Sequence, residues 1–157
     1  MIFHMSIAAD NPERAARIIA EIWQGSAYPF PPFARGAWIA MAGDGRNSAI
    51  EVYPRGAEMH PGRGDAEVQC QMGRVSRHGP SHSAIATPLE TDAVLAIARR
   101  HGLIAKVCDR GPFSVIEFWI EGCFLFELLT EEMQADYLRN MTIAGWEHYL
   151  GQAEQAA

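Results

Sequence analysis

The sequence lacks any apolar run long enough to cross a bilayer, and it lacks the basic stretches that bind nucleic acid. Its longest apolar runs fall far below the roughly 20 residues that a membrane-spanning helix needs. The 13 basic and 19 acidic side chains give a net charge of −6, with no segment rich in lysine or arginine. We therefore expect no membrane segment and no nucleic-acid partner, and a small molecule is the more natural ligand.

Cysteine is scarce as well. The three cysteines show no Cys-x-x-Cys spacing, so we expect neither a disulfide framework nor a structural zinc site. Met1 leads directly into a strand-like run, without the basic and then apolar stretch of a secretion signal. The expectation is a cytoplasmic protein with reduced cysteines.

What the sequence does contain is an approximate duplication. Residues 2–8 and 81–87 each carry a histidine near the start, alternate for about one strand and run into a proline-led helix start. In the first copy, Asn11-Pro12 supplies a cap residue followed by proline at the first helical position. In both copies the helix is followed by strand patterns, of which the second in the first copy is degraded by prolines. We predict an α+β fold made of two βαβββ units.

The length of 157 residues suits a single domain with its own core. Unit one is expected over about residues 2–54 and unit two over about 82–130, joined by a glycine- and proline-rich connection, 55–81, with one short strand at 67–70. In unit two, Thr87 to Glu90 has the pattern of a capping box and predicts a helix start at Pro88. Helical spacing after Thr130 predicts a C-terminal helix over about 131–150, with a break at Gly145 as one variant.

Two histidines and two glutamates occupy equivalent places in the two units. His4 and His82 lie on the first strands, and Glu51 and Glu127 lie on the last strands. Glu51 follows His4 by 47 residues, and Glu127 follows His82 by 45. Each residue alone is more typical of an ordinary polar position on a strand, but the matching positions favour a shared site for a divalent metal.

This arrangement resembles the vicinal oxygen chelate superfamily, which includes glyoxalase I, bleomycin resistance proteins and extradiol dioxygenases. The resemblance covers about residues 2–130 and implies that the two units form a cupped, half-barrel mixed sheet around one divalent metal ion (Ni, Co, Mn, Fe or Zn). It also implies that the protein is a homodimer. Carried over position by position, it makes His4, Glu51, His82 and Glu127 the metal ligands, with Glu127 as the catalytic base and Glu51 as the second candidate.

The turn Ile120-Glu121-Gly122-Cys123 leads to a prediction about the substrate pocket. A two-residue loop would set Phe118 opposite Leu125 and Ile116 opposite Glu127, and opposed residues share a face of the sheet. We therefore expect Ile116, Phe118 and Leu125 to line the substrate side of the cup.

Three functions fit these residues. The leading hypothesis is a metal-dependent lyase or isomerase of glyoxalase type that abstracts a proton next to a carbonyl of a small molecule. A dioxygenase or antibiotic-modifying enzyme of the same fold would use only His4, His82 and Glu127. A metal-free binding protein of the bleomycin-resistance type is the third, and the aromatic stretch 28–33 would suit its ligand.

Overall fold

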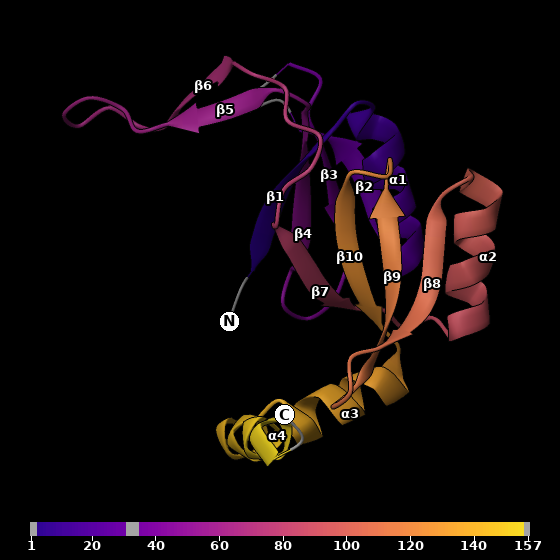
Figure 1. The fold of residues 1–157 in the computed structure, drawn as a ribbon. Coiled ribbons are helices and arrows are strands. Elements are labelled where there is room, and N and C mark those ends of the chain that lie inside the picture. Colours follow the sequence, from indigo (N-terminus) through magenta and orange to yellow (C-terminus); the bar gives the residue numbers. More distant parts are fainter. Residues whose placement is uncertain (1–2, 31–34, 156–157) are drawn as a thin grey trace. The chain divides into compact units, whose positions relative to one another are not determined.

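The computed structural model describes residues 3–30 and 35–155, which group into two compact units (Figure 1). The units comprise Met1–Ser81 with Ile120–Phe124 (unit 1), and His82–Trp119 with Leu125–Ala157 (unit 2). The predicted α+β class and the two βαβββ modules are confirmed. Across the described part of the chain, no helix is both long and apolar enough to cross a membrane.

Unit 1 contains a four-stranded sheet with one helix packed on it. Its sheet order is β1-β4-β3-β2; β1 runs parallel to β4, and the other neighbours are antiparallel. The elements are β1 (His4–Ala9), α1 (Pro12–Trp23), β2 (Ser26–Pro29), β3 (Trp38–Met41) and β4 (Ala49–Pro54). Apolar side chains of α1, Ile18, Ile19 and Ile22 among them, are fully buried, so this helix covers one face of the sheet and leaves the other for polar side chains.

The first helix forms as the sequence predicts. Asn11 caps it by accepting a hydrogen bond from the backbone nitrogen of Arg14 at 3.0 Å, and Pro12 is the first helical residue. Gly25 follows the helix because a β-carbon there would collide with the carbonyl of Met41. This close approach lets the chain turn straight from α1 into β2.

The connection between the two modules contains a hairpin that the sequence pattern only half revealed. Strands β5 (Ala57–His60) and β6 (Gln69–Met72) pair antiparallel, whereas a single short strand at 67–70 was expected. Glu58, His60 and Gln71 share a polar face, on which His60 contacts Glu58 along β5 at 3.1 Å and Gln71 across the ribbon at 3.0 Å. The backbone pairing and this side-chain contact order part of a connection that is rich in glycine and proline.

Unit 2 repeats the sheet of unit 1. Its order is β7-β10-β9-β8, and β7 runs parallel to β10 as β1 does to β4. The elements are β7 (His82–Ala86), α2 (Thr91–His101), β8 (Ile104–Asp109), β9 (Ser114–Ile120) and β10 (Phe124–Leu129). Helix α2 packs along β8 and buries Val94, Ile97 and Ala98.

Helix α2 begins three residues later than the capping box predicts. The hydroxyl of Thr87 accepts a hydrogen bond from the backbone nitrogen of Leu89 at 3.2 Å, so it closes a local turn and does not cap the helix. Glu90 is the N-cap, and its side chain makes no capping bond. The predicted start at Pro88 is therefore wrong.

The C-terminal segment forms two helices, α3 (Glu131–Asn140) and α4 (Ile143–Gln155), where one was expected over 131–150. The break lies at Met141 and Thr142. The Thr142 hydroxyl accepts a hydrogen bond from the backbone nitrogen of Gly145 at 3.0 Å and so starts a new helix. Gly145, the predicted place for a break, lies inside the first turn of α4.

Candidate functional site

In unit 1 the strand register brings one of the predicted histidines next to one of the predicted glutamates. Ser6 pairs with Glu51 across β1 and β4, and His4 lies two residues earlier on the same face. Ile7 and Ala9, which alternate with them, are buried toward the opposite face. His4 Nε2 and Glu51 Oε1 are 3.9 Å apart, with side chains 62% and 14% exposed.

The second carboxylate oxygen of Glu51 is held by two hydroxyl groups. Ser6 Oγ and Tyr53 Oη each donate to Glu51 Oε2 at 3.0 Å. Burial raises the pKa of the Tyr53 hydroxyl, and the bond to Glu51 raises it further, so Tyr53 is a neutral donor at neutral pH. The Phe30 ring meets the Tyr53 ring edge-on with centroids 6.3 Å apart. Two neutral donors on Oε2 therefore turn Oε1 toward His4.

Unit 2 repeats this register residue for residue. Ala84 pairs with Glu127, and His82 lies two residues before Ala84 on the same face of β7. The difference of two residues between the two His-to-Glu separations is therefore taken up outside the paired strands. The positions that carry the two hydroxyls in unit 1 are Ala84 and Leu129 here, and neither has a donor to offer.

A guanidinium holds Glu127 in their place. Arg110 donates from Nε and Nη2 to Glu127 Oε1 at 2.9 and 2.7 Å, and from Nη2 to Glu117 Oε1 at 2.8 Å. Lys106 Nζ lies 3.4 Å from the other oxygen of Glu117. The hydrogen bond from Arg110 lowers the pKa of Glu117, and the two carboxylates raise the pKa of Arg110. Both glutamates are thereby drawn into one ion-pair network.

The same network shows which residues of β9 share a face with Glu127. Because one guanidinium binds both carboxylates, Glu117 lies on the face of Glu127, where the two-residue hairpin register puts Ile116. Cys123 N does donate to Ile120 O at 2.9 Å, as in the predicted turn, but β10 begins only at Phe124. Ile116 alternates with Glu117 along β9 and therefore lies on the opposite face of the sheet, contrary to the predicted register.

This face assignment affects two of the three residues expected at the substrate pocket. Ile116 and Phe118 are completely buried, so in this structure neither presents its side chain to a ligand. Leu125 is half-buried, and its contact with substrate stays a prediction. Of the expected aromatic stretch 28–33, Tyr28 is exposed, whereas Pro31 to Phe33 lie outside the described residues.

One pair of the predicted donors lies near the spacing that a shared metal ion needs. His4 Nε2 and Glu51 Oε1 are 3.9 Å apart, too far for a hydrogen bond; neighbouring ligands on one ion, each bonded at roughly 2.1 Å, lie about 3.0–3.4 Å apart, so this pair would have to move closer by about 0.5–1 Å to share an ion. No three His, Cys, Asp or Glu side chains within residues 3–30 and 35–155 are grouped so as to hold an ion. His4 and Glu51 would thus need further ligands, and His82 and Glu127 remain the predicted ones.

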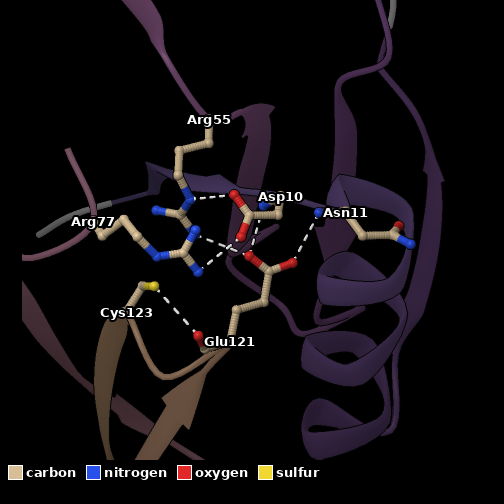
Figure 2. Close-up of polar contacts among 6 residues, drawn as sticks. All are labelled: Asp10, Asn11, Arg55, Arg77, Glu121 and Cys123. Carbon is tan, nitrogen blue, oxygen red and sulfur yellow. Dashed lines mark hydrogen bonds and ion pairs between the residues drawn. The ribbon is translucent and has the colours of Figure 1, made fainter. Parts of the chain in front are cut away.

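A second polar cluster in unit 1 was not foreseen from the sequence (Figure 2). Glu121, at the turn after β9, accepts from the backbone nitrogens of Asp10 and Asn11 at 2.6 and 2.8 Å, where α1 begins. Arg55 binds Asp10 and Glu121 at 2.6 and 2.9 Å and is only 7% exposed; Arg77 adds a contact to Asp10 at 3.0 Å. The only hint in the sequence is one acidic residue at the tip of an apolar hairpin.

Comparison with known proteins gives matches of fold only. No family model matches the chain, and no curated protein matches its sequence. A point mutant of FosX, the genomically encoded fosfomycin resistance protein of Listeria monocytogenes, complexed with Mn(II) and 1S,2S-dihydroxypropylphosphonic acid, matches with a TM-score of 0.53. The identity is 12%, over 82% of this chain and 90% of that chain.

Two further matches agree. A putative glyoxalase family protein from Bacillus anthracis has a TM-score of 0.53 at 16% identity, covering 82% of this chain and 92% of that one. The oxidase ChaP-H2 has a TM-score of 0.50 at 13% identity, covering 83% and 93%. The vicinal oxygen chelate fold predicted from the sequence is confirmed by these matches.

Proposed function

We propose that this protein is a metal-dependent enzyme that acts on a small molecule through His4, Glu51, His82 and Glu127. The observation that carries the proposal is the shared register: in each unit the histidine stands two residues before the strand partner of the glutamate. Such a match concerns side chains on the more exposed strand faces, where core packing does not dictate residue type. A common ligand role explains it. The four ligands would come from one chain or from two.

The proposed reaction is that of a lyase or isomerase, by proton abstraction next to a carbonyl. A bound metal would polarise the substrate carbonyl as a Lewis acid. Glu127 is the proposed base, because it already has an alternative partner in Arg110 when it is not a ligand. Glu51 is the second candidate; like Glu127, it accepts two hydrogen bonds on one carboxylate oxygen, and its donors are the hydroxyls of Ser6 and Tyr53.

The FosX complex supports a divalent metal and a small substrate rich in oxygen, since that protein binds Mn(II) together with a dihydroxypropylphosphonic acid. It also keeps a second candidate function open, an antibiotic-modifying enzyme or dioxygenase with three ligands. In that case Glu51 would stay off the metal, and the hydroxyls of Ser6 and Tyr53 would be its permanent partners.

Association of two copies is part of the proposal. Apolar side chains of α3 and α4 are strongly exposed in the single chain, among them Leu138 at 75%, Ile143 at 82% and Trp146 at 43%. Burial of such a surface in a homodimer would remove it from water. Analytical ultracentrifugation at micromolar concentration measures the mass; a monomer would contradict this part.

The test of the metal site begins with protein purified without chelator. We expect about one divalent ion per proposed site by elemental analysis, and His4→Ala and His82→Ala should each weaken Mn²⁺ or Ni²⁺ binding by about 100-fold or more in calorimetric titrations. His78→Ala, which changes an exposed histidine of the connection, is the matched control and should bind like the wild type.

Substitution of the glutamates separates the remaining readings. Glu51→Gln should weaken metal binding strongly if four ligands are used, and should leave it nearly unchanged if Glu51 is off the metal. Wild-type protein that binds none of these ions would instead be a metal-free binding protein. Equal affinities for His4→Ala and His78→Ala would show that the metal lies elsewhere.

A further inference from the structure

The geometry points to Arg110 as a resident cation that competes with the metal for Glu127 and so sets the metal affinity of the unit 2 half of the site. This inference rests on the proposed function, because it takes Glu127 to be a metal ligand. It goes further by assigning a role to a residue that is not itself a ligand. A supporting hydrogen-bond donor raises the metal affinity of its ligand, whereas Arg110 would lower it.

The first reason is the place where the guanidinium binds. Both donors of Arg110 fall on one oxygen of Glu127, Oε1, at 2.9 and 2.7 Å, and so use both of its lone pairs. A metal ion can reach that oxygen only if Arg110 leaves it. On the other oxygen, Oε2, the ion would lie across one carboxylate from a guanidinium, and two positive charges at such a distance repel each other.

The second reason is that Arg110 can release Glu127 and still keep a carboxylate partner. Its side chain is 32% exposed, and it also binds Glu117, which is 14% exposed and lies next to Lys106. When Glu127 turns to a metal, Arg110 can keep its bond to Glu117 and exchange the other for water. The guanidinium therefore neutralises Glu127 in the metal-free protein without blocking the metal permanently.

The contrast with unit 1 strengthens the argument. Among the residues that the structure describes, the side chains that donate hydrogen bonds to Glu51 are the neutral hydroxyls of Ser6 and Tyr53, and they occupy Oε2 while Oε1 faces His4. Neutral donors orient a ligand and leave its charge for the metal. A cation bound to the carboxylate neutralises that charge and so weakens its attraction for the metal. The two halves should therefore respond in opposite directions when the partners of their glutamates are removed.

The experiment compares Arg110→Gln with Lys106→Gln, which removes a neighbouring cation that pairs only with Glu117 in this network. Apoprotein is titrated with Mn²⁺, and unfolding is followed without metal. Arg110→Gln should bind Mn²⁺ about tenfold more tightly while unfolding at a lower temperature, since it loses the charge-assisted bonds that join the turn after β8 to β9 and β10. Lys106→Gln should stay within about twofold of the wild-type affinity.

Glu117→Gln provides a second measurement with the opposite sign. It leaves Glu127 as the sole carboxylate partner of Arg110 in the network, so Mn²⁺ should bind about two- to threefold more weakly. This variant keeps the Arg110–Glu127 pair and is expected to fold even if Arg110→Gln does not.

The outcomes distinguish the two proposals. Tighter binding by Arg110→Gln or weaker binding by Glu117→Gln supports the competition, even if wild-type protein itself binds Mn²⁺ only at millimolar concentration. Unchanged or reversed affinities in both variants, with His4-dependent binding intact in the wild type, overturn the role of Arg110 and leave the proposed function standing. Absence of Mn²⁺ binding in wild type and variants alike overturns both.

Discussion

The two units place a histidine and a glutamate at the same strand register but surround the glutamate with different hydrogen-bond donors. In unit 1, Glu51 accepts from the hydroxyls of Ser6 and Tyr53, whereas in unit 2 Glu127 accepts from the guanidinium of Arg110. The backbone frame is shared, since the pairings of β1 with β4 and β7 with β10 correspond residue by residue. The duplication therefore fixes where the candidate ligands stand, and the side chains around them set how each one behaves.

The helices that follow the first strands also differ, in the side-chain hydrogen bonds at their N-termini. The start of α1 has the carboxylate of Glu121 on two backbone nitrogens and Asn11 as a cap, but the start of α2 has Glu90 without a capping bond. A negative charge at a helix N-terminus meets unpaired N–H groups and the positive end of the helix dipole. Side-chain hydrogen bonds thus hold the start of α1, whereas Glu90 provides none at the start of α2.

The largest effect that would sharpen this comparison is on stability. Glu121→Ala removes the acceptor of two backbone N–H groups and one partner of Arg55, which is nearly buried, so we expect a loss of about 2–4 kcal/mol in the free energy of unfolding. Glu90→Ala at the other helix start should change it by less than about 0.5 kcal/mol. Urea unfolding measures both, and equal losses would show that the two helix starts are not held differently.

The element order could be predicted because its signals are local. Alternation placed the histidine strands, and Asn11-Pro12 marked the start of α1 to the residue. The ligand candidates followed from the repeat, since equivalent positions in two copies of a unit can be matched without knowing the structure. Only the pairing of the strands then turned matching positions into a common register.

What could not be predicted depends on contacts between distant residues. Glu121 and Asp10 are 111 positions apart in the sequence, and no local pattern indicates that the Glu121 carboxylate accepts from the Asp10 backbone nitrogen just before α1. The face that each β9 residue presents depended on the turn between β9 and β10, and Glu117 shares the face of Glu127 where Ile116 was expected. Thr87 has the sequence of a cap, but its hydroxyl bonds to a nearer nitrogen and the helix starts later. In each case tertiary contacts or turn geometry, which local sequence patterns do not encode, decided the outcome.

A smaller effect tests the neutral donors of unit 1. Tyr53→Phe and Ser6→Ala each remove one hydroxyl from Glu51 Oε2, and each should weaken Mn²⁺ binding by about three- to tenfold because the carboxylate is less well oriented. Tyr28→Phe removes an exposed hydroxyl from the same unit and serves as the control. The comparison fails if Tyr53→Phe tightens binding, because Glu51 and Glu127 would then respond alike to the loss of their partners.

The smallest effect concerns the acid range, where the ion pair between Arg110 and Glu117 in unit 2 should weaken. The hydrogen bond from Arg110 lowers the pKa of Glu117 below its ordinary value of 4.5. A carboxyl whose pKa is depressed by folding adds stability above its unfolded pKa and loses that contribution as the pH falls through the folded value. Glu117→Gln should therefore lower the free energy of unfolding by about 1 kcal/mol at pH 7, because Arg110 keeps Glu127 as a partner. Below the folded pKa of Glu117, wild type and variant should converge, since the protonated carboxyl and the amide are both neutral while Arg110 and Lys106 remain charged. Urea unfolding of both proteins between pH 7 and pH 3 gives the difference directly. A difference that stays constant over this range would mean that Glu117 contributes through packing and not through its charge.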